Sequence, residues 1–494
     1  MFYQKRKLVI LIAMFFYTVL VYGHAKSQIE FDIVLRNGRV MDPDTGLDAI
    51  RDIGISGKRI TVVSDSTLVG KEIIDVSGLV VAPGFIDLHA HGQDMASNRL
   101  QVADGVTTAL ELELGVYPVG EWLRSRQGHA LINYGATVGH WNSRVKILDD
   151  VDVTHMLSLT KEDRARIFQD KGVYEEASTE QIAALLAMFK QGLAEGALGI
   201  GLGLDYTPGA SHQEILSVFK LAAEQETIIF IHMRHSEGIF RALQEVFSNV
   251  VVTNAATHIV HLNSSSGDYA SQALEMIRSA REQGLDITTE AYPYTAGASL
   301  IESAIFDHLE SNEMSDEAFR FMEWPKTGER LTASTFRKYR DQGGLVIIHG
   351  RKESVSEWLV AQPDVLVASD GISFASGPAH PRGAGTFSRI LGYYSRERGV
   401  ITLMDALKKM TLLPAQRLES VAPQMKNKGR MQAGFDADIT IFDPASIIDR
   451  ATYRQGGLTS LGVIHVLVNG KFVIRNTALV EGVFPGQAVV GVTK

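Results

Sequence analysis

Two histidines one residue apart, His89 and His91, are the residues of this sequence best placed to do chemistry. They end an apolar run that bends at Pro83 and Gly84 and then continues to Leu88. Successive side chains of a strand alternate between its faces, so both imidazoles point the same way. Two imidazoles at the end of a strand can chelate one metal ion. A pair of surface histidines is the alternative, and the rest of the sequence argues against it.

Further metal-compatible side chains lie at the carboxyl ends of later apolar segments. A single histidine at a strand end is more often a hydrogen-bonded wall residue than a ligand. A set of six imidazoles and carboxylates at the same end of separate strands rarely arises by chance. Both groups are ordinary metal ligands. The sequence therefore predicts a metal site made by His89, His91, Glu113, His232, His261 and Asp370.

The second strand offers two carboxylates for this site. Glu111 and Glu113 share a strand face, and two buried carboxylates are costly without a cation or another partner. Glu113 lies nearer the carboxyl end and is the expected ligand, with Glu111 as the alternative. His258 precedes His261 by three residues, so it faces the opposite way and is expected to be structural. His235 falls in the loop or helix expected after the fifth strand, and His140 and His349 lack a supporting context, so all three are left outside the site.

The elements that must position these residues alternate between strands and helices. Eight strands are predicted, at 85–88, 106–114, 132–138, 198–204, 227–231, 257–260, 287–290 and 365–368. Helical patterns lie between them, and one begins at a capping box formed by Ser178 and Gln181. Alternation of this length favours parallel pairing, and eight strands predict an α/β fold with a (β/α)8 TIM-like barrel. Such barrels place their chemistry at the carboxyl ends of the strands.

Both ends of the chain have the pattern of a small β domain. Short strand segments fill 31–80 and return after Gly434, and the Arg-Asn-Gly at 36–38 and the Ser-Gly-Lys at 56–58 are hairpin signals. We expect the two ends to pack as one β-sandwich, with parts at 28–80 and 426–494, around a catalytic barrel at 81–425. Residues from about 299 to 345 are an expected insertion, either a lid or a peripheral helical pair.

The first residues differ in kind from the rest. Three basic residues at 5–7 precede an apolar stretch at 8–21, and small and polar residues follow. This pattern predicts a signal peptide over 1–25, because the apolar stretch is short for a membrane span. We expect export to the periplasm or beyond and no stable membrane insertion after cleavage, with an uncleaved anchor as the alternative.

The composition narrows the class of protein. The chain has 494 residues, of which 45% are apolar and 21% charged, as is ordinary for a soluble globular protein. Its formal charge of −9 supplies no basic stripe, so nucleic acid is not an expected partner. The absence of cysteine excludes disulfides and thiolate metal ligands.

The predicted site lies in segments that resemble a known enzyme family. The Pro-Gly-Phe-Ile-Asp-Leu-His-Ala-His of 83–91 is similar to the first-strand signature of the amidohydrolase superfamily of metal-dependent hydrolases. Further segments resemble its N-acyl-D-amino-acid deacylase (D-aminoacylase) branch, and the similarity covers essentially everything after the signal peptide. These segments contain Gly209, His232, His261, Glu290, Asp370 and His380, and the last is the Ala-Gly-Phe-Asp-Ala-Asp-Ile-Thr-Ile-Phe-Asp-Pro of 433–444.

The resemblance implies zinc-dependent hydrolysis of the amide bond of N-acyl-D-amino acids, with one or two zinc ions. It implies four histidine ligands and gives Asp370 the roles of ligand and general acid/base. That branch usually has a metal-bridging cysteine after the second strand, whereas this chain has Glu-Leu-Glu and no cysteine. A carboxylate can also bridge two zinc ions, so Glu113 is expected to take that place.

The resemblance also suggests which residues hold the substrate. By similarity, Tyr206, Tyr292 and Arg382 are candidates for binding the substrate carboxylate, for which a guanidinium offers a bidentate fork. A surface ion pair is the alternative for Arg382. The branch often has lysine two residues after the strand-six histidine, where this chain has Asn263, so the preferred amino acid stays open.

Other functions remain open at this point. Cyclic-amide hydrolases of the dihydroorotase or hydantoinase kind usually have a carboxylated lysine at the end of strand four, and 198–206 contains no lysine. A dipeptidase acting on D-residue peptides is a closer variant. A barrel that serves only as a binding module should have lost ligands, whereas every expected position except the cysteine is filled. The sequence favours a hydrolase acting on a small N-acyl amino acid.

Overall fold

A parallel eight-stranded sheet lies at the centre of the computed structural model, and every predicted barrel strand contributes to it. The structure describes residues 30–156, 159–310, 314–375, 377 and 379–492, so the predicted signal peptide lies outside the described residues. In chain order the strands are β6 (Phe85–Asp87), β7 (Val106–Val116), β8 (Asn133–Gly139), β9 (Ile200–Gly203), β10 (Ile228–His232), β11 (Ala256–Ile259), β12 (Ile287–Ala291) and β17 (Val365–Val367).

The sheet curls into a nearly closed barrel whose first and last strands meet through side chains. Backbone ladders join neighbouring strands in order from β17 to β6. Between those two strands, Ser369 donates to the Asp87 carboxylate from its amide at 3.0 Å and from its hydroxyl at 2.5 Å. A parallel bridge joins Ala90 to Gly371. This junction, the seam, closes the barrel next to His89, and burial raises the pKa of Asp87 to about 6.

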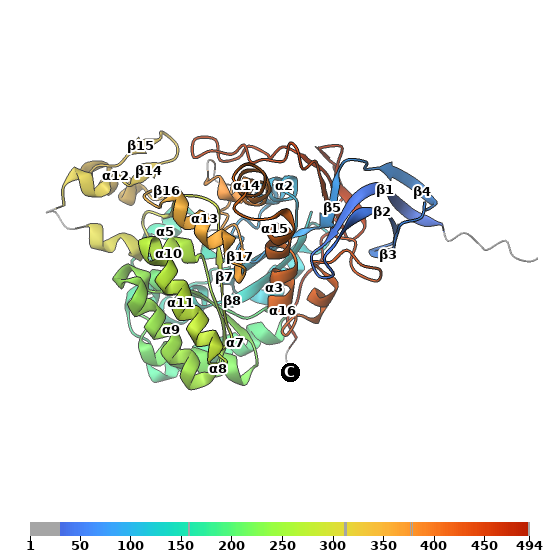
Figure 1. Cartoon of the computed structure of the whole chain (residues 1–494). Helices are drawn as coiled ribbons and strands as arrows, with labels where there is room; N and C mark the ends of the chain where they lie inside the picture. The colour runs from blue at the N-terminus through green and yellow to red at the C-terminus, as the bar shows by residue number, and fades with distance from the viewer. Residues whose placement is uncertain (1–29, 157–158, 311–313, 376, 378, 493–494) are drawn as a thin grey trace, which may run out of the picture.

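The barrel strands are apolar on both faces because helices cover the outside. All 11 residues of β7 are buried, as expected for a strand between a barrel interior and a helical layer. The capping box predicted at Ser178 and Gln181 is confirmed at the start of one of these helices. Most of the helices surround the barrel in Figure 1. The α-helices of the described residues, of which α12 belongs to the insertion, are α2 (Met95–Ala103), α3 (Val119–Arg126), α4 (His140–Asp149), α5 (Lys161–Ile167), α6 (Lys171–Tyr174), α7 (Thr179–Ala194), α8 (His212–Glu224), α9 (Ile239–Thr253), α10 (Leu262–Ser266), α11 (Ala270–Glu282), α12 (Ala333–Gln342), α13 (Glu353–Ala361), α14 (Arg382–Arg389), α15 (Leu403–Met410) and α16 (Leu412–Leu418).

The two ends of the chain share one nine-stranded sheet, which confirms the joint β domain. Strands from the chain start are β1 (Phe31–Asp42), β2 (Leu47–Ser56), β3 (Arg59–Ser64), β4 (Gly70–Asp75) and β5 (Val80–Pro83). Those from the chain end are β18 (Ile439–Phe442), β19 (Val463–Val468), β20 (Lys471–Arg475) and β21 (Ala478–Leu479). The ends join where β5 pairs antiparallel with β18, and β1 to β4 lie to the right of the barrel in Figure 1.

One of the two predicted hairpins is wrong. The pair β2 and β3 turns at 57–58 as predicted, whereas β1 runs straight through 36–38. Its pairing with β2 shifts register between Leu35 and Gly38, and Asn37 takes a left-handed φ of 61°. Asparagine tolerates that conformation, so here the Arg-Asn-Gly makes a β-bulge instead of a turn.

The insertion is a small antiparallel sheet, so the alternative of a peripheral helical pair is wrong. Its strands are β13 (Gly297–Leu300), β14 (Met322–Trp324), β15 (Glu329–Arg330) and β16 (Leu345–Ile348), and α12 packs beside them. The segment has its own apolar core, which includes Phe306, Trp324 and Phe336. The branched run of β16 favours a strand over a helix.

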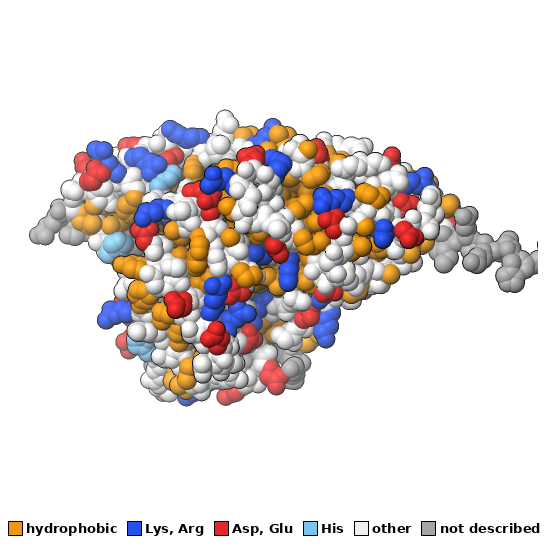
Figure 2. Space-filling model, in the orientation of Figure 1, with side chains coloured by type: hydrophobic (Ala, Val, Ile, Leu, Met, Phe, Trp, Pro, Cys, Tyr) orange, Lys and Arg blue, Asp and Glu red, His pale blue; other side chains and the backbone are white. Residues whose placement is uncertain are grey.

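The outer surface mixes charges of both signs. On the face shown in Figure 2, Lys and Arg alternate with Asp and Glu, and neither sign forms a continuous field. Within the described ranges, no helix is both long and apolar enough to cross a bilayer. Histidines and carboxylates cluster instead in the interior, at the carboxyl end of the barrel.

Candidate metal centre

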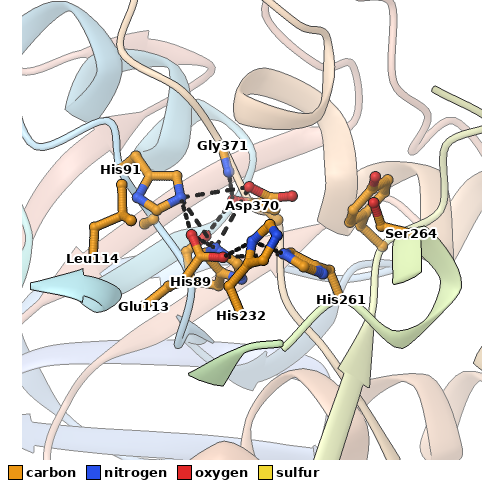
Figure 3. A network of polar contacts seen from close by, with 12 residues as sticks. His89, His91, Glu113, Leu114, His232, His261, Ser264, Asp370 and Gly371 are labelled. Atoms are coloured by element: carbon orange, nitrogen blue, oxygen red, sulfur yellow. Dashed lines mark hydrogen bonds and ion pairs between the residues drawn. The ribbon is translucent and has the colours of Figure 1, made fainter. Parts of the chain in front are cut away.

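The six predicted ligands converge at the carboxyl ends of the barrel strands (Figure 3). His89 and His91 follow β6, Glu113 lies near the end of β7, and His232 ends β10. His261 and Asp370 follow β11 and β17 and take left-handed φ angles of 35° and 54°. Non-glycine residues adopt such angles rarely, and they persist where the surroundings hold them, often at functional sites.

Glu113 lies between two pairs of histidines. Its Oε2 is 3.1 Å from His89 Nε2 and 3.0 Å from His91 Nε2. Its Oε1 is 2.7 Å from His232 Nδ1 and 3.0 Å from His261 Nε2. Each carboxylate oxygen thus faces its own pair of imidazoles, which is the arrangement of a carboxylate that bridges two cations.

Two neighbouring glutamates determine which ring nitrogen carries the proton in the first histidine pair, His89 and His91. His89 Nδ1 is 2.6 Å from Glu290 Oε1, and His91 Nδ1 is 2.8 Å from Glu111 Oε2. These carboxylates accept hydrogen bonds from the Nδ1–H groups, so the lone pairs of both rings are on Nε2. The two Nε2 atoms are only 3.1 Å apart. Two lone pairs and a carboxylate oxygen at such distances are suited to sharing a cation.

The second histidine pair has the same character. His232 Nδ1 and His261 Nε2 are 3.0 Å apart beside Glu113 Oε1. The other ring nitrogen of His232 faces Asp205 Oδ2 at 3.6 Å, which favours a proton on Nε2 and a lone pair on Nδ1. The side chains of both pairs are buried, so the cation would sit largely shielded from water.

Imidazole and carboxylate donors are ordinary zinc ligands. Among the described residues, four groups of three such donors lie close enough together to hold a metal ion, and two of these groups include Glu113. One consists of His89, His91 and Glu113, and the other of Glu113, His232 and His261. Glu113 is common to both. Glu111 contacts the outer ring nitrogen of His91 and also His155, so of the two carboxylates on β7 it is Glu113 that faces both histidine pairs.

The electrostatics reflect the crowding of these groups. Burial alone would raise the pKa of Glu111, but the charges of His91 and His155 lower it to about 2. Burial disfavours the charged form of His232, yet Glu113 and Asp205 raise its pKa to about 9. Burial and the charge of His232 lower the pKa of His261 to about 4, although Glu113 opposes this shift. Burial alone would raise the pKa of Glu113, but the charges of His89 and His232 lower it well below its usual value, so Glu113 remains ionised, as a metal ligand must.

Asp370 is positioned by an arginine. Its Oδ2 accepts an ion-paired contact from Arg382 Nη1 at 2.8 Å, while its Oδ1 is 3.5 Å from the Nε2 atoms of both His89 and His91. Burial alone would raise the pKa of Asp370, but the charges of Arg382 and His89 lower it below its usual value. One oxygen is thus fixed by a cation, and the other faces the metal centre.

Several residues that support the ligands were missed by sequence reasoning. Glu290 joins His89 to His258 by contacts of 2.6 and 3.0 Å, so His258 is indeed structural and not a ligand. Asp205 contacts His235 at 2.9 Å as well as facing His232. Glu290 ends a barrel strand and carries a carboxylate, so the strand-end pattern that revealed Glu113 also marks Glu290.

The three predicted substrate-binding residues lie around the same centre. Tyr206 lines the cavity, and its hydroxyl is 3.1 Å from Ser299 Oγ. Arg382 is 2% exposed, so the alternative of a surface ion pair is wrong. Its guanidinium carbon lies 4.8 Å from the ring centre of Tyr292, whose buried hydroxyl has no hydrogen-bond partner among the described residues.

Two histidines left outside the prediction have other partners. His140 pairs with Glu214 at 2.7 Å beside Arg144, and His349 contacts Glu323 at 3.1 Å in the insertion. His235 lines the cavity and contacts Asp205.

A cavity of about 220 Å³ opens onto the metal centre. Ligands form its floor, and β13, β16 and the turn at 304–309 form a wall, so the insertion borders the site. The cavity suits a small molecule with both polar and apolar parts. Residues lining it include Tyr206, Ser264, Leu300, Phe306, Arg351 and Arg382.

Sequence comparison gives two findings. A family model described as "Amidohydrolase family" matches residues 72–152, which contain His89, His91 and Glu113. The D-aminoacylase of Alcaligenes xylosoxydans xylosoxydans is 27% identical over 507 residues, which cover 92% of this chain and 96% of that protein.

Solved structures show the same fold. A structure of D-aminoacylase, described with a binuclear metal centre, has 25% identity and a TM-score of 0.77 and covers 93% of this chain and 100% of its own. The N-acyl-D-glutamate deacylase of Bordetella bronchiseptica, complexed with zinc and a phosphonate inhibitor, has 24% identity and a TM-score of 0.78, with the same coverage. The barrel and the β domain predicted from the sequence are confirmed.

Proposed function

We propose that this chain, a relative of the D-aminoacylases among the amidohydrolases, is a zinc-dependent hydrolase that cleaves the amide bond of N-acyl-D-amino acids. The observation that carries the proposal is the position of Glu113, with one carboxylate oxygen at each histidine pair. Its ligands are the two histidine pairs, Glu113 and Asp370. When bound, zinc lowers the pKa of a coordinated water to about 7 and polarises a carbonyl oxygen.

The protein itself contributes a general acid/base, Asp370, which accepts a proton and later returns it. Arg382 fixes Oδ2, so Oδ1 is the oxygen that accepts a proton as water attacks the amide carbonyl carbon. The carbon–nitrogen bond then breaks, and the same carboxyl group returns the proton to the departing amine nitrogen. The products are a carboxylate and a free D-amino acid.

The substrate is held by the residues on either side of this carboxylate. The guanidinium of Arg382, which pairs with Asp370, lies over the ring of Tyr292, and Tyr206 lines the cavity next to His232, with ring centres 5.0 Å apart. These three residues are placed to orient the acyl amino acid so that its amide reaches Asp370. Holding the reacting groups in this way lowers the entropic part of the barrier.

The rival functions fit less well. The bridging place taken by a carboxylated lysine in cyclic-amide hydrolases is filled here by Glu113, and β9 contains no lysine. A module without catalysis would have no need of a base held by a buried arginine. Export through the predicted signal peptide would place this activity outside the cytoplasm, where free N-acyl amino acids can be taken from the surroundings.

The function is tested by comparing paired substrates. Purified protein loaded with zinc is expected to hydrolyse N-acetyl-D-amino acids, with little turnover of the matching L-isomers and at least about one zinc bound per chain. Amine release is measured alongside metal analysis. A preference for the L-isomers, or turnover of hydantoins alone, contradicts the proposal, and less than one zinc per chain favours a binding module.

Glu290 offers a test of the first histidine pair. Replacing it with glutamine removes the charge that holds His89 Nδ1–H, at 2.6 Å in the wild type. Loss of such a partner typically lowers metal affinity about 10- to 100-fold. Zinc titration should therefore show weakened binding in Glu290→Gln. A matched control is Glu323→Gln, which removes a carboxylate from His349 in the insertion and should leave zinc affinity unchanged.

A further inference from the structure

One arginine on the cavity wall, Arg351, pairs with no carboxylate among the described residues. Arg351 follows β16 and is half-buried, with its side chain lining the same cavity as the metal ligands. None of the ion pairs found among the described residues includes Arg351, whereas Arg382, which lines the same cavity, is paired with Asp370. Arg351 therefore brings a positive charge to the cavity that the protein does not neutralise locally.

Neutral groups hold this guanidinium in place. Its Nη2 donates to Ser264 Oγ at 2.6 Å, its Nε to Ser264 O at 3.4 Å and its Nη1 to Ile348 O at 3.3 Å. Its backbone amide donates to Thr295 O at 3.2 Å. These contacts fix the planar group without removing its charge, which prepares it for an anion.

The local backbone makes room for the guanidinium. Gly297 lies beside it in β13, and a Cβ there would come within 2.8 Å of Arg351 Nη1. Any side chain at Gly297 would have to displace the arginine. The strand thus leaves the space of one side chain free for the guanidinium at the wall of the cavity.

Arg351 is linked to the metal centre through Ser264, which lies one helical turn after the ligand His261. Ser264, which holds the guanidinium, donates its backbone amide to His261 O at 2.8 Å, and Figure 3 shows it beside that ligand. Asn263, between them, is turned away, and its amide donates to Tyr292 O at 2.9 Å. A group bound by Arg351 would therefore lie in the cavity that the metal ligands line, beside the strand β13 that Arg382 also contacts.

We infer that Arg351 is a specificity-determining residue that receives a carboxylate from the amino-acid part of the substrate. The inference rests on the proposed function and deepens it. An N-acyl amino acid has an α-carboxylate, and acidic amino acids have a second one on the side chain. Both present the same chemistry to a guanidinium fork.

Variants of Arg351 separate these two sources. Arg351→Gln and Arg351→Lys are assayed on N-acetyl-D-leucine, N-acetyl-D-glutamate and N-acetyl-D-leucinamide, the last of which has no carboxylate. In Arg351→Gln we expect kcat/KM to fall about 10- to 100-fold on the substrate whose carboxylate is bound, mostly through KM, with partial recovery in Arg351→Lys. A loss on N-acetyl-D-glutamate alone identifies the side-chain carboxylate, and a loss on both acids identifies the α-carboxylate.

The neutral substrate distinguishes recognition from a structural role. N-acetyl-D-leucinamide should be cleaved equally well by wild type and Arg351→Gln, because it offers no anion. The matched control is Lys352→Gln, which removes the neighbouring exposed cation that pairs with Asp268 outside the cavity. Equal losses on all three substrates, or none on any, overturn the inference.

Failure of the proposed function gives a different result. If zinc-loaded wild type cleaves no N-acyl-D-amino acid, calorimetric titration with N-acetyl-D-glutamate and N-acetyl-D-leucine still tests Arg351. Binding that weakens about 10-fold or more in Arg351→Gln supports the carboxylate site without the activity. Equal binding in both proteins, or no binding in wild type, overturns it.

Discussion

Asp370→Asn is expected to lose about 10²- to 10⁴-fold in kcat while retaining bound zinc, because the amide cannot accept the proton of the attacking water. The substitution changes little else. Asparagine tolerates the left-handed φ of 54° at this position, and its oxygen can still accept from Arg382. The two histidine pairs and Glu113 are untouched, so metal binding is expected to survive.

The measurement combines turnover, zinc content and folding. Arg382 is buried and loses an opposite charge in this variant, so the Tm is expected to fall, and assays belong well below it. Asp364→Asn is the matched control, because Asp364 directly precedes β17 whereas Asp370 follows it. Asp364 pairs with Arg278 and Arg281, away from the cavity. Near-normal turnover in Asp370→Asn would show that another group carries the proton.

Glu113→Gln is expected to lose zinc, and activity with it. The glutamine amide presents one oxygen and one NH₂ group, so it cannot offer an acceptor to both histidine pairs. Zinc content should fall below one per chain after dialysis, with kcat/KM reduced by at least about 10³-fold at ordinary zinc concentrations. The loss should exceed the roughly 10- to 100-fold weakening typical of a residue that only supports a ligand.

Glu111→Gln provides that comparison on the same strand. Glu111 contacts the outer nitrogen of His91 and also His155. It lies two residues before Glu113, on the same face of β7. Its loss should weaken zinc binding within the range for supporting residues and leave a measurable activity that excess zinc restores. If Glu111→Gln and Glu113→Gln lose zinc equally, the bridging position of Glu113 is wrong.

The convergence of the candidate ligands could be predicted because a parallel barrel gathers the carboxyl ends of its strands at one place. Once the strands before His89 and His232 were recognised, strand ends alone placed both residues in the site. Supporting contacts could not be found this way. His89 and Glu290 belong to segments that are far apart in the sequence and near opposite ends of the strand order. They come into contact only because the sheet curves into a barrel.

The structure of the insertion and the position of Arg351 could not be predicted from the sequence, for related reasons. Short strands in a polar segment give weak periodic signals, so 299–345 was expected to be a lid or a helical pair. Arg351 lies in an irregular loop, where its charge alone says nothing of its surroundings. Its place on the cavity wall depends on the antiparallel pairing of β13 with β16. Conversely, Asn37 shows that a strong local turn signal yields to a neighbouring strand.

The seam between β6 and β17 has a consequence for the whole chain. The residues that meet there, Asp87 and Ser369, are 282 positions apart, and the backbone ladder does not join them. With His89 on one side and Asp370 on the other, a shared zinc ion would cross-link the beginning and the end of the barrel. It would be a reversible cross-link in a chain without cysteine, and it would stabilise the folded state because the dispersed ligands of the unfolded chain form no such site.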